Sequence, residues 1–184
     1  DMEVGLLPNF NEILYVTTTS ERSVISVEIL GNGKAMVRSF VTPDTPTNLG
    51  FPATTGVINS PDNLAQDALG NIYIIEDAPN RNDVGGDIWF ARDTNNDGVA
   101  ESIDHFMSLQ VAGSESTGLI FNPVDPTKFV MAVQHPTSTD LDAVPDGFGD
   151  SVWEFGIGAV VPPPCNTNQD SGPTFGGEEE TSTG

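Results

Sequence analysis

Residues 71–77 read NIYIIED, and residues 87–93 read DIWFARD. Both segments are rich in Ile, Tyr, Trp and Phe, and both are bounded by Gly, Asn and Asp, which is typical of β-strands. NIYIIED is the more apolar of the two, so we expect it to be an inner strand that is packed on both faces. The pair predicts neighbouring strands of one sheet, and the rest of the chain follows the same pattern.

Short apolar segments separated by Gly, Pro, Asn and Asp run along the chain, and hardly any segment has the periodicity of a helix. The predicted strands are 12–18, 23–30, 34–40, 62–67, 71–77, 87–93, 102–108, 117–123, 128–134 and 151–157. From Val161 onward the sequence combines Pro, Gly, Ser, Thr and Glu. This composition predicts a disordered linker or tail over residues 161–184.

The predicted strands form a repeat. Its second strands start at residues 12, 71 and 128, in successive steps of 59 and 57 residues. An all-β period of this size, with about four strands in each unit, is typical of a β-propeller blade. A β-sandwich is the alternative, because short strands at regular spacing fit both folds.

We therefore predict an all-β fold with a partial β-propeller over residues 1–160. The blade repeats are placed near 12–42, 62–108 and 117–157 and comprise the end of one blade, a complete blade and most of a third. Three blades do not close a ring, so we expect the remainder of the propeller to lie outside this chain. Trp89 and Trp153 occupy matching positions in successive units, which indicates a role in packing between blades.

The composition limits the partners. The 184 residues include 27 Asp and Glu but only 6 Lys and Arg, which gives a formal net charge of −21. Such a surface repels nucleic acid and anionic membranes and attracts divalent cations. No apolar run is long enough for a membrane span. The single cysteine, Cys165, excludes an internal disulfide but leaves the cellular compartment open.

Residues 93–104, DTNNDGVAESID, match the pattern D-x-[DN]-x-[DN]-G of calcium-binding loops. The predicted ligands are the side chains of Asp93, Asn95 and Asp97, the carbonyl of Val99, Glu101 directly or through water, and Asp104 in the usual place of Glu. The loop joins two strands, so we expect the calcium to be structural. The alternative is a solvated polar turn, because Asn, Asp and Gly favour turns without a metal. A second acidic loop, with Asp140, Asp142, Asp146 and Asp150, is irregularly spaced and is a weaker candidate.

Three segments carry a family resemblance: SPDNLAQDALGNIYIIED (60–77), SESTGLIFNPVDPTKFVMAVQHP (114–136) and GDSVWEF (149–155). They resemble the C-terminal part of the PhoX-type alkaline phosphatase family over roughly residues 60–156. The resemblance implies a six-bladed propeller of the periplasm or cell exterior. It also implies hydrolysis of phosphomonoesters with calcium, together with iron, at a site on the propeller axis.

The resemblance also implies roles for individual residues. Glu76 takes the place of an axial acidic metal ligand, Glu115 matches a second acidic position near the site, and Asp62 lies in the turn before the inner strand. All three are predicted metal ligands. Arg81 is the one arginine placed to contact a phosphate. Glu76, Glu115 and Arg81 are therefore the predicted catalytic residues. From the residues alone, Glu76 and Asp77 read as an acidic strand end that caps a turn.

Two classes of function follow. The first is part of a secreted, calcium-dependent phosphomonoesterase, in which this chain alone is inactive. The second is a non-catalytic, calcium-stabilised propeller that serves as an extracellular binding or structural component. The family's iron site uses a cysteine of an earlier blade, whereas Cys165 lies in the tail. His105 is predicted to be a surface or edge residue and His135 a structural turn residue. A sugar- or peptide-binding propeller is a third class, but the sequence offers no aromatic platform for it.

Overall fold

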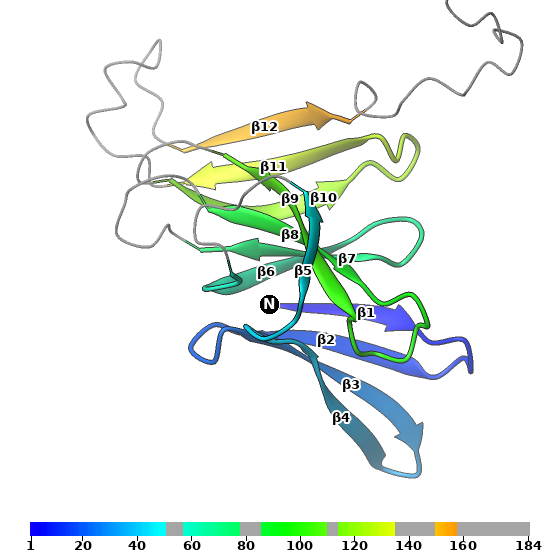
Figure 1. Cartoon of the computed structure of the whole chain (residues 1–184). Coiled ribbons are helices and arrows are strands. Elements are labelled where there is room, and N and C mark those ends of the chain that lie inside the picture. The colour runs from blue at the N-terminus through cyan, green and yellow to red at the C-terminus, as the bar shows by residue number, and fades with distance from the viewer. Residues whose placement is uncertain (51–56, 78–85, 110–113, 135–149, 158–184) are drawn as a thin grey trace, which may run out of the picture.

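A computed structural model describes residues 1–50, 57–77, 86–109, 114–134 and 150–157. The described residues form twelve β-strands in three sheets and contain no helix (Figure 1). The all-β prediction is therefore confirmed. No described segment is a helix that is long and apolar enough to cross a membrane.

The first sheet is a four-stranded antiparallel meander in the order β1-β2-β3-β4. The second sheet has the order β5-β9-β8-β7-β6 and is antiparallel from β6 to β9, whereas β5 pairs with β9 in parallel. The third sheet is antiparallel, in the order β10-β11-β12. The strands are β1 (Met2–Leu6), β2 (Glu12–Thr18), β3 (Ser23–Gly31), β4 (Lys34–Val41), β5 (Thr47–Gly50), β6 (Pro61–Gln66), β7 (Ile72–Glu76), β8 (Asp87–Arg92), β9 (Ser102–Ser108), β10 (Glu115–Phe121), β11 (Lys128–Gln134) and β12 (Ser151–Gly156).

All ten predicted strands are present, with ends within two residues of their predicted positions. The strands β1 and β5 were not predicted. Because β1 completes the first sheet, the first unit is a four-stranded sheet and not only the end of one. Because β5 pairs outside β9, the strand SIDHFMS is not at the edge of its sheet as expected. Asp62 lies within β6, in agreement with the predicted strand over 62–67 and not with its placement in a turn before the inner strand.

The pairing expected of the alternative β-sandwich is not observed. The strand β7 pairs with β6 and β8, and β11 pairs with β10 and β12. Apart from β5, which pairs with β9, each strand instead pairs with strands next to it along the chain, and the three sheets stack in chain order (Figure 1). The number of blades and the closure of a ring stay predictions.

Two hydrophobic layers hold the stack together. The first lies between the first and second sheets and includes Ile13, Tyr15 and Phe40 from one side and Ile74 and Trp89 from the other. The second lies between the second and third sheets and consists of Ala65, Tyr73, Ile75, Ile88, Leu109, Leu119, Phe129, Met131 and Val133. All five residues of β7 are buried, because its side chains enter both layers alternately. Each fully buried Ile stabilises the fold by roughly 1.5–3 kcal/mol.

The three sheets have the same orientation in the stack, because their first strands β1, β6 and β10 run in the same direction. The Asp1 carboxylate accepts a hydrogen bond from the Leu64 amide (3.0 Å), and Gly5 lies against Gln66, so β1 and β6 run side by side in one direction. The start of β10 lies at the same end as the start of β6, because Ser116 Oγ donates to the Glu76 carbonyl (3.2 Å) and Glu76 pairs with Pro61. Each sheet therefore turns the same face toward the next one.

The two tryptophans lie at matching positions of the third strands of their sheets. Trp89 is paired with Ile74, and Trp153 is paired with Met131. Trp89 is completely buried in the first layer, whereas Trp153 is 38% exposed on the last sheet of the stack. The packing role predicted for Trp89 agrees with its place in the first layer.

Candidate functional site

Acidic side chains gather where the second and third sheets end together. The strand β7 ends at Glu76 and is followed by Asp77, whose amide donates to the Ser60 carbonyl (2.8 Å). The strand β10 begins at Glu115. The hydrogen bond from Ser116 Oγ to the Glu76 carbonyl fixes the start of β10 beside the end of β7. This contact between the two sheets therefore brings the acidic residues to one end of the stack.

Asp77 and Glu115 are in direct contact, and their carboxyl groups share a hydrogen bond. The pKa of Asp77 is raised to about 6, first by partial burial, then by the hydrogen bond to Glu115 and by the negative charges of Asp62 and Glu115. Gln134 Nε2 donates to the Glu115 carboxylate (2.6 Å), and Asn63 Nδ2 donates to that of Asp62 (2.7 Å). Two carboxyl groups thus interact directly, under the influence of the negative charge of a third, and either a proton or a cation relieves the repulsion between them.

Glu76 belongs to the same strand end, but its side chain enters the first hydrophobic layer. It is 3% exposed, and its Oε1 accepts hydrogen bonds from the Asn59 amide (2.7 Å) and from Trp89 Nε1 (3.0 Å). Burial raises the pKa of Glu76 to about 7; the two hydrogen bonds oppose this shift, and the nearby Asp87 charge adds to it. Because side chains alternate along a strand, Asp77 and not Glu76 meets the carboxyl of Glu115.

Behind Glu76 lies a buried polar pair that the sequence analysis missed. His105 Nε2 lies 2.8 Å from Asp87 Oδ1, and Ser108 Oγ also donates to this oxygen. Asp87 is 1% exposed and His105 is 5% exposed, so the prediction of His105 as a surface or edge residue was wrong. His105 is paired with Trp89 and faces the same buried layer, and β5 lies beyond it in the sheet. The pair joins β8 to β9.

The predicted calcium loop folds around its own carboxylates. The Asp93 carboxylate accepts hydrogen bonds from the amides of Asp97 (3.0 Å) and Gly98 (2.9 Å). Asn95 Oδ1 also accepts from the Asp97 amide (2.9 Å), and Asp97 Oδ1 accepts from Val99 (2.9 Å). Partial burial raises the pKa of Asp93; its two backbone hydrogen bonds oppose the shift, and the charges of Asp97 and Glu101 add to it. The turn therefore concentrates oxygen atoms around its own backbone amides.

The turn is also fixed to the first sheet. Gly98 has φ +82°, a conformation that favours glycine, and Ser26 Oγ donates to its carbonyl (2.6 Å). A Cβ at this position would lie 2.7 Å from Ile13 Cδ1. The glycine of the motif is thus required both for the backbone angle and for the close approach of β2.

The last two predicted ligands of the motif, Glu101 and Asp104, form hydrogen bonds and ion pairs with other residues. Glu101 accepts hydrogen bonds from the Thr94 amide (2.9 Å) and from Thr94 Oγ1 (3.2 Å). Asp104 lies within β9, where its carboxylate forms an ion pair with Arg92. Within the described ranges, no group of three or more His, Cys, Asp or Glu residues is arranged to hold a metal ion. The calcium ligands therefore stay predictions.

Several predicted residues lie outside the described residues. These are Arg81, His135, Asp140, Asp142, Asp146 and Cys165. Asp150 is described and precedes β12 directly.

The described strands form an all-β fold with acidic residues at the ends of neighbouring sheets, and the family comparison agrees with the all-β class. The family model of alkaline phosphatase PhoX matches residues 40–137, which is more than half of the chain, and the chain belongs to this family. The match runs from the end of β4 past the end of β11 and includes the strand-end acids and the 93–104 loop. The family resemblance found in the sequence is thus confirmed. Neither a curated protein nor a solved structure matches the chain.

Proposed function

We propose that this chain is part of a secreted, calcium-dependent phosphomonoesterase of the alkaline phosphatase type. The observation that carries the proposal is the contact between Asp77 and Glu115, near the charge of Asp62, at one end of two neighbouring sheets. Oxygen-only donors of this kind suit calcium, and a cation held there would neutralise a substrate phosphate and stabilise the charge of the transition state. The described part of the chain offers no thiolate for iron, so the proposal assigns no iron ligand.

The residues of this chain would bind and orient the cation. Asp77 and Glu115 already share one hydrogen bond, and a divalent cation would replace the shared proton with a stronger attraction for both carboxylates. Gln134 holds Glu115 in position through its Nε2. Glu76 lies behind them, and the earlier expectation that it is itself a metal ligand stays part of the proposal.

The loop over residues 93–104 is proposed as a separate, structural calcium site. Its support is the arrangement of Asp93, Asn95 and Asp97 around the turn at Gly98. Since Arg92 binds the carboxylate of Asp104, we expect fewer protein ligands than in a complete loop and correspondingly weaker binding.

One observation favours the second candidate function, a non-catalytic calcium-stabilised propeller. Phosphate sites commonly use arginine, whose planar group binds two phosphate oxygens at once. Among the described arginines, Arg38 is paired with Glu28 and Arg92 with Asp104, and Arg22 lies in the turn between β2 and β3. The catalytic proposal therefore needs Arg81 or an arginine outside this chain.

The two candidates differ in a measurable way. We expect the chain to bind calcium with an affinity that Asp77→Asn and Glu115→Gln each lower at least tenfold, as measured by isothermal titration. Asp44→Asn, in an exposed turn between β4 and β5, is the matched control. Calcium binding that is unchanged in both variants would overturn the metal site. Hydrolysis of p-nitrophenyl phosphate by a protein containing the complete ring, lost in both variants, would support the enzyme over the binding protein.

A further inference from the structure

The strand β6 begins with a β-bulge at Asp62. In the ladder with β7, Pro61 is opposite Glu76 and Asn63 is opposite Ile75, so Asp62 is an extra residue on its strand. Neighbouring side chains of a regular strand point to opposite faces of the sheet, yet Asn63 Nδ2 donates to the Asp62 carboxylate (2.7 Å). The two side chains therefore lie on the same side of the strand, as a bulge allows.

The bulge decides where the carboxylate of Asp62 lies. A shift of one residue in register moves a side chain to the opposite face of its sheet. With the bulge, the negative charge of Asp62 acts on Asp77, which shares a hydrogen bond with Glu115. Bulges next to functional sites commonly redirect one side chain in this way. The irregular start of β6 is thus part of the geometry of the acidic strand ends.

The first sheet holds the bulge in place. Thr17 Oγ1 donates to the Asp62 carbonyl (2.9 Å), and Thr19 Oγ1 donates to the Pro61 carbonyl (2.9 Å). The Asp62 carbonyl is the nearer of two acceptors for Thr17, since the Asp1 carbonyl lies at 3.3 Å. Successive carbonyls of a regular strand point to opposite edges, so two that accept from the same side mark an irregular backbone. The two hydroxyls therefore bind β6 where it departs from a regular strand.

We propose that Thr17 and Thr19 are positioning residues of the cation site, because they hold the bulge that keeps the Asp62 carboxylate near Asp77 and Glu115. The inference rests on the cation site proposed above and adds a contribution from the first sheet. The hydroxyls donate to the backbone of β6, so they act on the site through Asp62.

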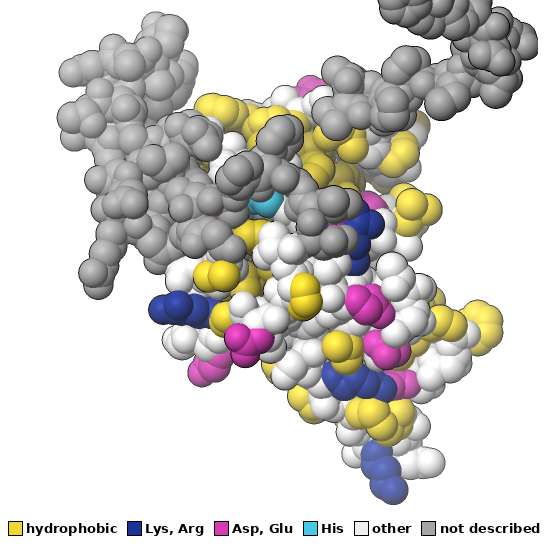
Figure 2. Space-filling model, viewed as in Figure 1, with side chains coloured by type: hydrophobic (Ala, Val, Ile, Leu, Met, Phe, Trp, Pro, Cys, Tyr) yellow, Lys and Arg dark blue, Asp and Glu magenta, His cyan; other side chains and the backbone are white. Residues whose placement is uncertain are grey.

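The position of each carboxylate matters because of the charges around it. Acidic groups elsewhere are neutralised by neighbours, as Asp104 is by Arg92, and Figure 2 shows Asp and Glu side chains beside Lys and Arg side chains on one face of the molecule. Among the described residues, no ion pair involves the strand-end carboxyls, whose side-chain donors are the amides of Gln134 and Asn63. The affinity for calcium depends on the number of charges that face it, so a displaced carboxylate lowers it.

The test is the calcium affinity of the intact 184-residue chain, measured by isothermal titration in an Asp97→Ala background that disables the proposed loop site. Thr17→Val combined with Thr19→Val keeps the shape of both side chains and removes both hydroxyls, and we expect at least threefold weaker binding. Thr17→Ser combined with Thr19→Ser keeps the hydroxyls and should bind as the parent does. Thr18→Val is the matched control, because the Thr18 hydroxyl donates to the Ser23 carbonyl within the first sheet (2.9 Å).

A double-mutant cycle with Asp62→Asn distinguishes positioning from a general weakening of the fold. Asp62→Asn removes the charge and keeps the size of the side chain, and it should itself weaken binding at least threefold. In this background the two valine substitutions should change the affinity less than twofold, because the carboxylate that they displace is already gone.

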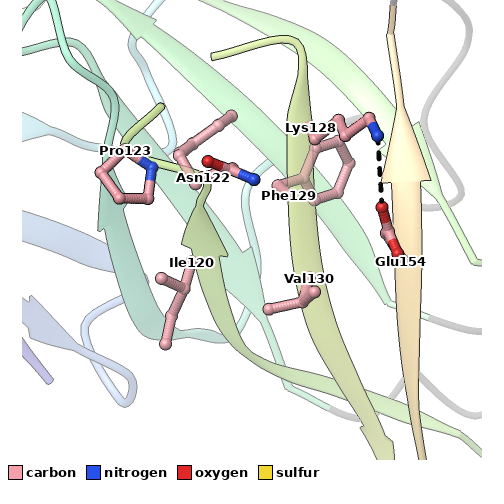
Figure 3. Close-up of a pocket in the computed structure, with 8 residues that line it drawn as sticks. Ile120, Asn122, Pro123, Lys128, Phe129, Val130 and Glu154 are labelled. Carbon is pink, nitrogen blue, oxygen red and sulfur yellow. Dashed lines mark ion pairs between the residues drawn. The ribbon is translucent and has the colours of Figure 1, made fainter. Parts of the chain in front are cut away.

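Glu154→Gln is the control for the loss of one negative charge. Figure 3 shows Glu154 in an ion pair with Lys128 (3.8 Å) beside a hollow of the third sheet. Lys128 begins β11, whereas Gln134, which holds Glu115, ends it. Glu154 therefore lies toward the opposite end of the third sheet, and its replacement should leave the affinity unchanged.

Circular dichroism and the melting curve of each variant establish that it is folded, and Thr19→Val alone replaces the pair of valine substitutions if the pair unfolds the chain. Weaker binding with valine, recovery with serine and no change in the controls support the proposal. Unchanged binding with valine, or an equal loss in the Asp62→Asn background, would overturn it and leave the cation site standing. Binding that does not depend on Asp77 and Glu115 would overturn the cation site itself, and this proposal with it.

Discussion

The substitution Glu76→Gln is expected to remove a dependence of stability on pH that comes from one buried carboxyl group. Glu76 is 3% exposed, and its pKa is raised from 4.5 to about 7, mainly by burial. The folded state therefore binds a proton more tightly than the unfolded state. The resulting stabilisation is complete below pH 4.5 and is lost as the pH rises through 7, where the carboxylate is ionised in both states.

The magnitude follows from the size of the shift. Each pKa unit corresponds to about 1.4 kcal/mol, so the free energy of unfolding should fall by on the order of 3 kcal/mol between these pH values because of Glu76 alone. Gln stays neutral throughout and keeps an oxygen that can accept from Asn59 and Trp89. The variant is therefore expected to lose this part of the pH dependence without losing the fold.

The assay is urea unfolding of both proteins at a series of pH values, with the difference between the two curves as the readout. The difference is needed because other groups titrate in the same range, including Asp77, whose pKa is raised to about 6. A difference that is constant from pH 4.5 to 8 would refute the reasoning, since it means that Glu76 titrates alike in both states. Added calcium that restores stability above pH 7 in the wild type, but not in the variant, would show that Glu76 contacts the cation.

Three further substitutions test other parts of the structure. Asp97→Ala should abolish most of the rise in melting temperature that calcium gives the wild type, and an equal rise in both proteins would leave only a polar turn. Gly86→Ala should destabilise the fold by about 1–3 kcal/mol in urea, because its Cβ would lie 2.7 Å from the Glu76 carbonyl oxygen. Gly156→Ala, which meets no atom within 4 Å, is its control. Trp89→Phe should raise the pKa of Glu76 further by removing the hydrogen bond from the indole, and a pH difference curve that does not move would contradict this.

The sequence by itself determined the strands, their repeat and the family. NIYIIED and DIWFARD form strands because β-branched and aromatic residues fit a buried sheet, and the Gly, Asn and Asp residues between them favour turns. These are local preferences, so the strands and turns can be recognised in the sequence without knowledge of the fold. The turn at Asp93, Asn95 and Asp97 could also be predicted from the sequence, because its hydrogen bonds join residues within five positions of one another.

Only the tertiary structure decided which acidic residues meet. The strand β5 has only four residues and pairs with β9 from far along the chain, and this pairing contributes to the burial of His105. Asp77 contacts Glu115, and Arg92 binds Asp104, because alternation along a strand and the register between strands set the direction of each side chain. A shift of one residue in register turns every side chain to the opposite face of its sheet. The spacing of residues in the sequence does not contain this information, because the register is fixed by the packing of whole sheets against one another.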